Sequence, residues 1–175
     1  MLSVKRPFIF GFAGWSGSGK TTLAEKVIKQ AVKSGISIST LKHAHHNFDA
    51  DIEGKDSFRH RAAGAGQVLV ASAKRTALFT EKTEEKTPEL SDLLSSLDDC
   101  DWVLVEGFKK EVFPKIEIFD EALSPEPLFQ TDKNIIAVVG VKQIERGNLP
   151  YFDRDDVTAI FSFLRETSQS QLDER

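Results

Sequence analysis

Apolar residues follow two patterns along this chain, one typical of buried strands and one typical of helices. Residues 7–12 (PFIFGF) carry no polar side chain, as in a strand buried on both faces of a sheet. The next segment has apolar residues at the spacing of one helical face, at Ala24, Val27, Ile28 and Ala31. Residues 36–42 (ISISTLK) then form a stretch rich in β-branched residues. This order predicts a parallel strand–helix–strand unit with a right-handed crossover.

The remaining chain continues the alternation. Further strands are predicted at 67–72, 76–80, 102–105, 115–119 and 135–139, and helices at 56–64, 89–97 and 155–164. Asp56 is the predicted N-cap of the first of these helices. The turn at 74–75 joins two strands into a hairpin, and the alternation in 115–119 (KIEIF) predicts a partly exposed strand.

The predicted fold class is therefore α/β. We expect a mostly parallel sheet covered by helices on both faces, with an extra hairpin. No linker divides the sequence, so residues 1–167 are expected to form one domain. Residues 168–175 are polar and are expected to form a frayed tail.

Length and composition narrow the class of protein. The chain has 175 residues, 23 basic and 27 acidic side chains, and a formal charge of −4. That balance argues against a general polyanion-binding surface, so no nucleic-acid partner is expected. The single cysteine, Cys100, excludes an intrachain disulfide. No apolar run approaches the roughly 20 residues that span a bilayer, so we expect a soluble, cytoplasmic protein without a membrane partner.

Residues 14–21 match the pattern G-x-x-x-x-G-K-[ST] between a predicted strand and a predicted helix. In such a loop, glycines allow consecutive N–H groups to converge on phosphate oxygens at the positive end of the helix. Lys20 is the expected catalytic residue, because it can reach the β- and γ-phosphates, and the Thr21 hydroxyl is an expected Mg²⁺ ligand. The predicted nucleotide-binding set is Gly14, Trp15, Ser16, Gly17, Ser18, Gly19, Lys20, Thr21 and Thr22.

An acidic group should complete the magnesium site. Ligands of a parallel sheet bind at the carboxyl ends of its strands, so Glu106 is placed suitably and Asp101 is at the wrong end of its strand. Glu106 is the predicted Walker-B-like acid, acting on Mg²⁺ directly or through water; the alternative is a solvated acid at a strand end. The lysines that follow indicate either a second anion site or a solvated charge run, at Lys109, Lys110 and Lys115.

A histidine- and aspartate-rich segment follows the second predicted strand, at the same sheet edge as the phosphate loop. Its candidate substrate or partner residues are His43, His45, His46, Asp49, Asp51, Lys55 and Asp56. Three interpretations stay open: a loop that senses nucleotide or substrate, a plain solvated loop, and a metal site. The spacing fits no zinc finger, and no cysteine is nearby.

Several of these strings together resemble one family. They are the phosphate loop, LKHAHHNFDAD at 41–51, GKDS at 54–57, AGA at 63–65, VAS at 70–72 and LVEGFK at 104–109. The chain resembles the molybdopterin-guanine dinucleotide biosynthesis protein B family over about residues 7–165. The histidine-rich string with its downstream GKDS is far more specific than the phosphate loop alone.

The resemblance implies a P-loop GTPase-like fold, usually a homodimer, that binds GTP with Mg²⁺ and is at most a weak GTPase. It also implies a partner, the nucleotidyltransferase that joins GMP to molybdopterin, beside which the family acts as an adapter or GTP supplier. Molybdopterin itself is a further expected partner. Carried over to this chain, residues 14–22 would hold the phosphates, Glu106 would take the Walker B position, and residues 43–56 would face substrate or partner.

Two other functions stay in competition with the adapter. A small-molecule kinase is one, because many kinases open with the same phosphate loop, although no long arginine-rich lid is visible. A GTPase that delivers a metal is the other, suggested by the histidines. The guanine-binding signature Asn-Lys-x-Asp is absent, since residues 131–134 (TDKN) have a different order, so guanine is implied by the resemblance alone.

Overall fold

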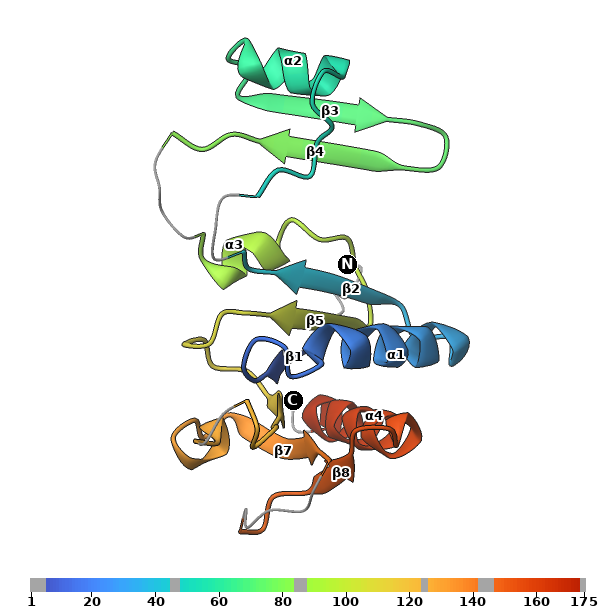
Figure 1. Ribbon diagram of the computed structural model, residues 1–175. Helices are drawn as coiled ribbons and strands as arrows, with labels where there is room; N and C mark the ends of the chain where they lie inside the picture. Colours follow the sequence, from blue (N-terminus) through green and yellow to red (C-terminus); the bar gives the residue numbers. More distant parts are fainter. Residues whose placement is uncertain (1–5, 45–47, 84–87, 124–125, 142–146, 174–175) are drawn as a thin grey trace. The chain divides into compact units, whose positions relative to one another are not determined.

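The computed structural model describes residues 6–44, 48–83, 88–123, 126–141 and 147–173. It divides the chain into two compact units, one built from residues 1–43 and 90–175 and the other from residues 44–89 (Figure 1). The sequence prediction placed residues 1–167 in one domain, whereas the structure separates the segment 44–89 as a unit of its own. Each unit is described by itself below.

The first unit is built on a six-stranded sheet in the order β2-β5-β1-β6-β7-β8, with every neighbouring pair parallel (Figure 1). Its strands are β1 (Phe8–Ala13), β2 (Ile38–Lys42), β5 (Trp102–Glu106), β6 (Lys115–Ile118), β7 (Ile135–Gly140) and β8 (Tyr151–Asp153). β8 was not predicted, because three residues are too short for a periodic pattern. Since all strands are parallel, their carboxyl ends meet at one edge of the sheet.

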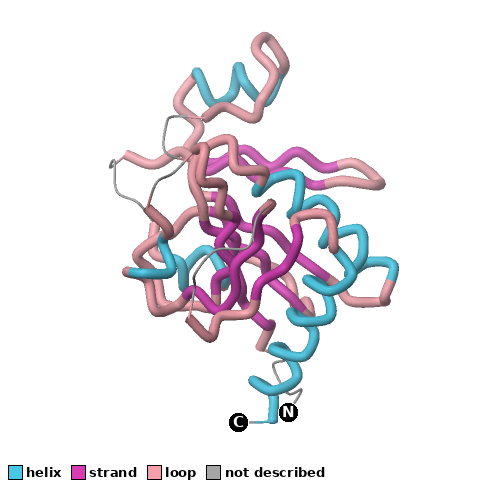
Figure 2. The backbone as a smooth tube through the Cα atoms, turned by 60° about the horizontal axis from the view of Figure 1, so that its bottom comes forward, coloured by secondary structure: helices cyan, strands magenta, loops and turns pink. Residues whose placement is uncertain are grey.

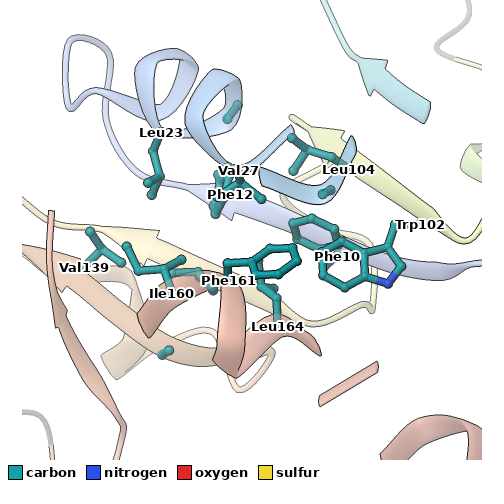
Figure 3. Packing of buried hydrophobic residues seen from close by; sticks show 14 of the residues in the cluster. Phe10, Phe12, Leu23, Val27, Trp102, Leu104, Val139, Ile160, Phe161 and Leu164 are labelled. Atoms are coloured by element: carbon teal, nitrogen blue, oxygen red, sulfur yellow. The ribbon is translucent and has the colours of Figure 1, made fainter. Parts of the chain in front are cut away.

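Both faces of this sheet are covered, as predicted. The long helices α1 (Lys20–Lys33) and α4 (Val157–Asp173) pack on one face and run beside the strands (Figure 2). The core on that face joins side chains from β1, β5 and both helices, including Phe10, Phe12, Leu23, Val27, Trp102, Leu104, Ile160 and Leu164 (Figure 3). None of the helices in the described part of the chain has the length and apolar composition needed to span a bilayer.

A second, smaller core covers the other face. Val103 and Val105 point to this side of β5, where the short helix α3 (Leu90–Leu94) supplies Leu90. Phe108 and Phe113, from the loop after β5, complete the cover.

The end of the chain differs from its prediction. The predicted helix 155–164 extends to Asp173, so the expected frayed tail from residue 168 is helical up to that point. Ser168 is buried and its hydroxyl oxygen accepts the indole N–H of Trp102 at 3.2 Å. The inward face continues from Ile160 through Leu164 to Ser168, and a serine is small enough to pack beside the indole. Composition alone pointed to a solvated tail because it does not reveal this partner.

β6 also differs from its prediction, because it is buried over its whole length instead of partly exposed. It lies between β1 and β7, and its two charged side chains have partners on neighbouring loops. The Lys115 ammonium donates to the carbonyls of Lys109 and Glu111 and to the Asp132 carboxylate, at 3.0, 2.8 and 3.0 Å. We call Lys115, Glu117 and Asp132 the β6 charge cluster.

The Glu117 carboxylate accepts two backbone N–H groups, from Leu128 at 2.7 Å and Phe129 at 2.8 Å. These residues belong to a short 3-10 helix, η1 (Leu128–Gln130). Burial raises the pKa of Glu117, and the two N–H groups oppose this shift. The native state therefore holds a proton on Glu117 more tightly than the unfolded chain does.

This pKa shift predicts a pH dependence of stability. Because the native pKa is raised, the contribution of Glu117 to the free energy of unfolding is largest below the unfolded pKa of about 4.3. This contribution should decrease as the pH rises through the raised native pKa of Glu117. Urea unfolding of wild type and Glu117→Gln at a series of pH values measures this contribution as their difference. Parallel pH profiles for the two proteins would contradict the prediction.

The second unit contains the predicted hairpin. β3 (Gln67–Ala71) pairs antiparallel with β4 (Thr76–Thr80), with Val68 opposite Phe79, and the helix α2 (Asp56–Ala62) packs on β3. Asp56 was the predicted N-cap, but it is the first helical residue and Lys55 takes the cap position without a side-chain hydrogen bond. The Asp56 carboxylate instead lies in the first turn, where negative charge is favoured by the helix dipole.

Candidate functional site

The predicted phosphate loop connects β1 to α1 in the structure. Gly14, Gly17 and Gly19 have φ angles of 139°, 80° and 92°, which side chains other than glycine rarely tolerate. Gly14 also needs space, since a Cβ there would lie 2.5 Å from the carbonyl oxygen of Ile118. Gly19 is the left-handed N-cap of α1. The glycines of the motif are therefore required by the backbone path of the loop.

Lys20 closes this loop. Its ammonium donates to the carbonyl oxygen of Trp15 at 2.6 Å, across the turn between them. Burial lowers the pKa of Lys20, the Glu106 carboxylate opposes that shift, and the ammonium groups of Lys109 and Lys42 add to it. Ser18 is buried beside Gly14, and within the described residues its hydroxyl has no hydrogen-bond partner. The loop thus places a half-buried cation and an unsatisfied hydroxyl at the N-terminus of α1.

Glu106 ends β5, the strand next to β1, at the same edge of the sheet as the phosphate loop. Its side chain is 17% exposed and lies 3.5 Å from the Lys42 ammonium. Thr21 is exposed in the first turn of α1. Carboxylate and hydroxyl oxygens are hard ligands that suit Mg²⁺. The donor set of Glu106 and Thr21 therefore fits a magnesium ion, and these residues would hold it.

Two lysines near Glu106 extend the site. Lys42 was not singled out in the sequence, although it pairs with Glu106 in the register of β2 and β5. Lys109 was a candidate, and its ammonium lies 5.9 Å from the centre of the Trp15 ring. Lys115 does not join them, because it is buried in the β6 charge cluster; Lys110 is exposed. Lys115 therefore cannot belong to a second anion site together with Lys109 and Lys110.

His43 lies directly beside Glu106. Its backbone N–H donates to the Glu106 carbonyl at 2.8 Å, and its ring packs 4.9 Å from the Phe108 ring. Gly107 permits this approach: its φ angle is 90°, and a Cβ there would lie 2.7 Å from the Cβ of His43. The structure therefore places one member of the predicted histidine segment at the phosphate-loop edge.

The acidic members of that segment are held within the second unit. Arg61, which no sequence motif indicates, donates to Asp49 at 2.9 and 3.1 Å, to Asp51 at 3.2 Å and to Glu81 at 2.6 Å. Hydrogen bonds from Arg61 lower the pKa of Asp49. Burial would raise the pKa of Asp51, but hydrogen bonds from Ser57 and Arg61 lower it overall. Asp49 and Asp51 thus tie the loop to α2.

The other members of the segment are not brought into a common cluster. Lys55 and Asp56 are exposed at the start of α2. His45 and His46 lie outside the described residues. Within the described part of the chain, no group of three or more His, Cys, Asp or Glu side chains is arranged to hold a metal ion.

Comparison with known proteins gives a consistent family assignment. The model of the family described as "Molybdopterin guanine dinucleotide synthesis protein B" matches residues 9–141. The molybdopterin-guanine dinucleotide biosynthesis adapter protein of Escherichia coli is 40% identical over 167 residues, covering 93% of this chain and 94% of that protein. The adapter protein of Haemophilus influenzae is 43% identical over 133 residues, covering 74% of this chain and 72% of that protein.

Solved structures agree with the fold. A MobB protein homolog from Bacillus stearothermophilus superimposes with a TM-score of 0.71 at 26% identity, over 93% of this chain and 98% of that one. Bacillus subtilis MobB superimposes with a TM-score of 0.69 at 32% identity, over 91% of this chain and 97% of that one. The parallel sheet and its helices are therefore shared with these proteins.

Proposed function

The chain belongs to the molybdopterin guanine dinucleotide synthesis protein B family, and from this premise we propose that it is a GTP-binding adapter in the biosynthesis of molybdopterin guanine dinucleotide. The observation that carries the nucleotide part of this proposal is the glycine loop between β1 and α1, with Lys20 and Glu106 at the same sheet edge. The adapter part rests on the names of its relatives in Escherichia coli and Haemophilus influenzae.

The loop supplies what a triphosphate requires. Backbone N–H groups at the start of α1 would donate to a bound anion, and the helix dipole favours negative charge there. Lys20 would exchange its hydrogen bond with the Trp15 carbonyl for one with phosphate oxygens. Trp15 is 49% exposed, so its ring is accessible beside this position. Burial of Lys20 strengthens its attraction to phosphate, because the local dielectric constant is below that of water.

Magnesium would neutralise the bound triphosphate. Thr21 and Glu106 would hold it, directly or through water, and the ion would supply charge stabilisation for the β- and γ-phosphates. The Lys42 ammonium lies 3.5 Å from the Glu106 carboxylate, so one positive charge is near that carboxylate.

The role of Glu106 predicts a magnesium-specific defect. Glu106→Gln keeps the shape of the side chain and removes its charge, so GTP affinity should fall about tenfold or more with Mg²⁺ present. Without Mg²⁺, affinity should change little. Titration calorimetry with MgCl₂ and with EDTA measures both values, and Glu25→Gln, on the exposed face of α1, is the matched control. Equal losses in the two conditions would assign Glu106 a structural role instead.

The proposed partners follow from the family. We propose that the adapter acts in the cytoplasm as a homodimer, that it works beside the nucleotidyltransferase joining GMP to molybdopterin, and that hydrolysis of GTP is weak. The segment from His43 to Asp56 is the proposed surface for molybdopterin or for this enzyme. Because Asp49 and Asp51 are held by Arg61, the exposed side chains of Lys55 and Asp56 are its more available contacts.

Titration calorimetry tests the whole proposal. GTP, ATP and molybdopterin are titrated into the full chain, each with and without the nucleotidyltransferase. We expect Mg²⁺-dependent GTP binding, weaker ATP binding, and molybdopterin binding that depends on the enzyme. Absence of GTP binding would reject the proposal. Multiple-turnover transfer of phosphate to an acceptor would favour a small-molecule kinase, and submicromolar zinc or nickel binding would favour a metal-delivering GTPase.

A further inference from the structure

Arg154 lies on the side of the phosphate loop opposite Glu106. β1 has β5 as its neighbour on one side, and β6, β7 and β8 follow on the other. Arg154 comes directly after β8, and its backbone N–H donates to the Gly140 carbonyl at 3.0 Å, so its position is fixed by the sheet. The carboxyl end of β8 lies at the same edge as the phosphate loop.

The Arg154 guanidinium reaches back to that loop. Its Nη1 atom lies 3.9 Å from the point where a Cβ on Gly19 would be, and Gly19 immediately precedes Lys20. The guanidinium therefore lies close to the N-terminus of α1, where an anion would bind. The side chain is 29% exposed, so it retains access to a ligand.

Among the residues that the structure describes, few acceptors contact the donors of this guanidinium. Nη2 lies 3.4 Å from the Asp120 carboxylate, which is longer than the roughly 2.7–2.9 Å of a strong charge-assisted hydrogen bond. Within the described residues, Nε is buried and has no hydrogen-bond partner. Arginine has five N–H donors, and burying one without an acceptor is unfavourable.

Asp120 fixes the direction of the guanidinium. It follows β6 by two residues, and its other carboxylate oxygen accepts the N–H of Ala122 at 3.1 Å. The carboxylate is 23% exposed and is therefore held between its own loop and Arg154. This arrangement orients the arginine without occupying its Nη1 donors.

The residues on the two sides of β1 suggest in which direction a nucleotide would lie across the loop. A magnesium ion held by Thr21 and Glu106 would stabilise negative charge on the terminal phosphates. Glu106 ends β5, so the terminal phosphates would lie on the β5 side of the loop. The rest of the nucleotide would then extend past Gly19 toward β6, β7 and β8. The α-phosphate is the anionic group on that path.

We propose that Arg154 is a ligand of the nucleotide α-phosphate, donating from its guanidinium to a non-bridging oxygen, and that Asp120 is its positioning residue. This inference rests on the proposed nucleotide-binding function and adds a residue that the loop motif does not contain. The triphosphate would then have two cationic contacts. Lys20 would contact its γ-phosphate end, and Arg154 would contact the end that carries the nucleoside.

The test uses the full chain with Mg²⁺ and compares GTP with the two diastereomers of its α-thio analogue. Arg154→Ala should weaken GTP binding about tenfold to a hundredfold, the range for a charged hydrogen bond. The preference of wild type for one diastereomer should largely disappear in this variant, because sulfur replaces the oxygen that Arg154 contacts. Arg154→Lys should restore part of the affinity, and Asp120→Asn should reduce the diastereomer preference with a smaller loss of affinity.

Controls separate this inference from the proposed function. Arg165→Ala removes an exposed arginine from α4 and should leave GTP binding unchanged. Wild type that fails to bind GTP would reject the proposed function itself.

If Lys20→Ala loses GTP affinity while Arg154→Ala keeps both affinity and diastereomer preference, only the α-phosphate inference is rejected. A changed ratio of GTP to ATP affinity in Arg154→Ala would also overturn it, because the arginine would then contact the base. If Arg154→Ala does not fold, the diastereomer preference is measured with Arg154→Lys and Asp120→Asn instead. A preference unchanged from wild type in both variants would reject the inference.

Discussion

Replacing Lys115 by methionine is expected to lower the free energy of unfolding by about 3–5 kcal/mol, the range for removing one partner of a buried ion pair. Lys115 is 2% exposed, and methionine fills a similar volume, so the loss would come from electrostatics and hydrogen bonds instead of from a cavity. Its ammonium is the hydrogen-bond donor to the carbonyls of Lys109 and Glu111 and to the Asp132 carboxylate. Without the ammonium, the half-buried Asp132 carboxylate and the two carbonyls lose this hydrogen-bond donor.

Urea unfolding followed by tryptophan fluorescence measures this change, because Trp102 is buried in the same unit. Lys110→Met is the matched control: Lys110 is exposed, so its replacement should change stability by less than about 0.5 kcal/mol. Adding Asp132→Asn to Lys115→Met should recover part of the loss, since the uncompensated carboxylate is then neutral. A stability loss below about 1 kcal/mol for Lys115→Met would show that the β6 charge cluster is not the support we infer.

Replacing Lys20 by alanine is expected to weaken Mg²⁺–GTP binding by about tenfold to 150-fold and to leave the fold intact. Charge-assisted hydrogen bonds contribute roughly 1.5–3 kcal/mol, which sets this range. In the described structure, the only side-chain hydrogen bond of Lys20 is to the Trp15 carbonyl, in a surface loop. Removing the Lys20 side chain should therefore not destabilise the core. The two cores on either side of the sheet do not include it.

Titration calorimetry of GTP measures the affinity, and a thermal unfolding scan checks that the variant is folded. Lys29→Ala, on an exposed position of the same helix, is the matched control and should bind as wild type does. Unchanged affinity in a folded Lys20→Ala protein would remove the basis for the phosphate-loop assignment.

The sequence was most informative where local patterns and motifs determine structure. The strand–loop–helix context of the phosphate loop and the hairpin of β3 and β4 follow from glycine positions, apolar spacing and a short turn. These features depend on residues close together in the chain. The element types were therefore predictable, with boundaries that shift by a few residues.

The prediction failed where a polar residue has a partner that is distant in sequence. The alternation in 115–119 indicated exposure, because a pattern of charges does not reveal that Asp132 and η1 supply partners for Lys115 and Glu117. Ser168 was assigned to a tail for the same reason, since its partner is Trp102.

The candidate site was incomplete for a related reason. Lys42 and Glu106 become neighbours only when the register of β2 and β5 is known. Arg154 approaches Gly19 only because β8 adds to the same edge of the sheet. A loop motif contains no information about these residues, whereas a parallel sheet gathers strand ends from the whole chain.

The position of β1 in the sheet also constrains how the protein is made. Its partners are β5 and β6, with Phe8 opposite Trp102 and Gly11 opposite Lys115. A ribosome delivers β1 early, and both of its edges stay without their native partners until the second half of the chain has emerged. The hairpin of β3 and β4, in contrast, can pair as soon as Thr80 has been synthesised. Long-range parallel pairing is slow, and an apolar strand with open edges is prone to aggregate, so nascent chains halted before β5 should depend on chaperones most strongly.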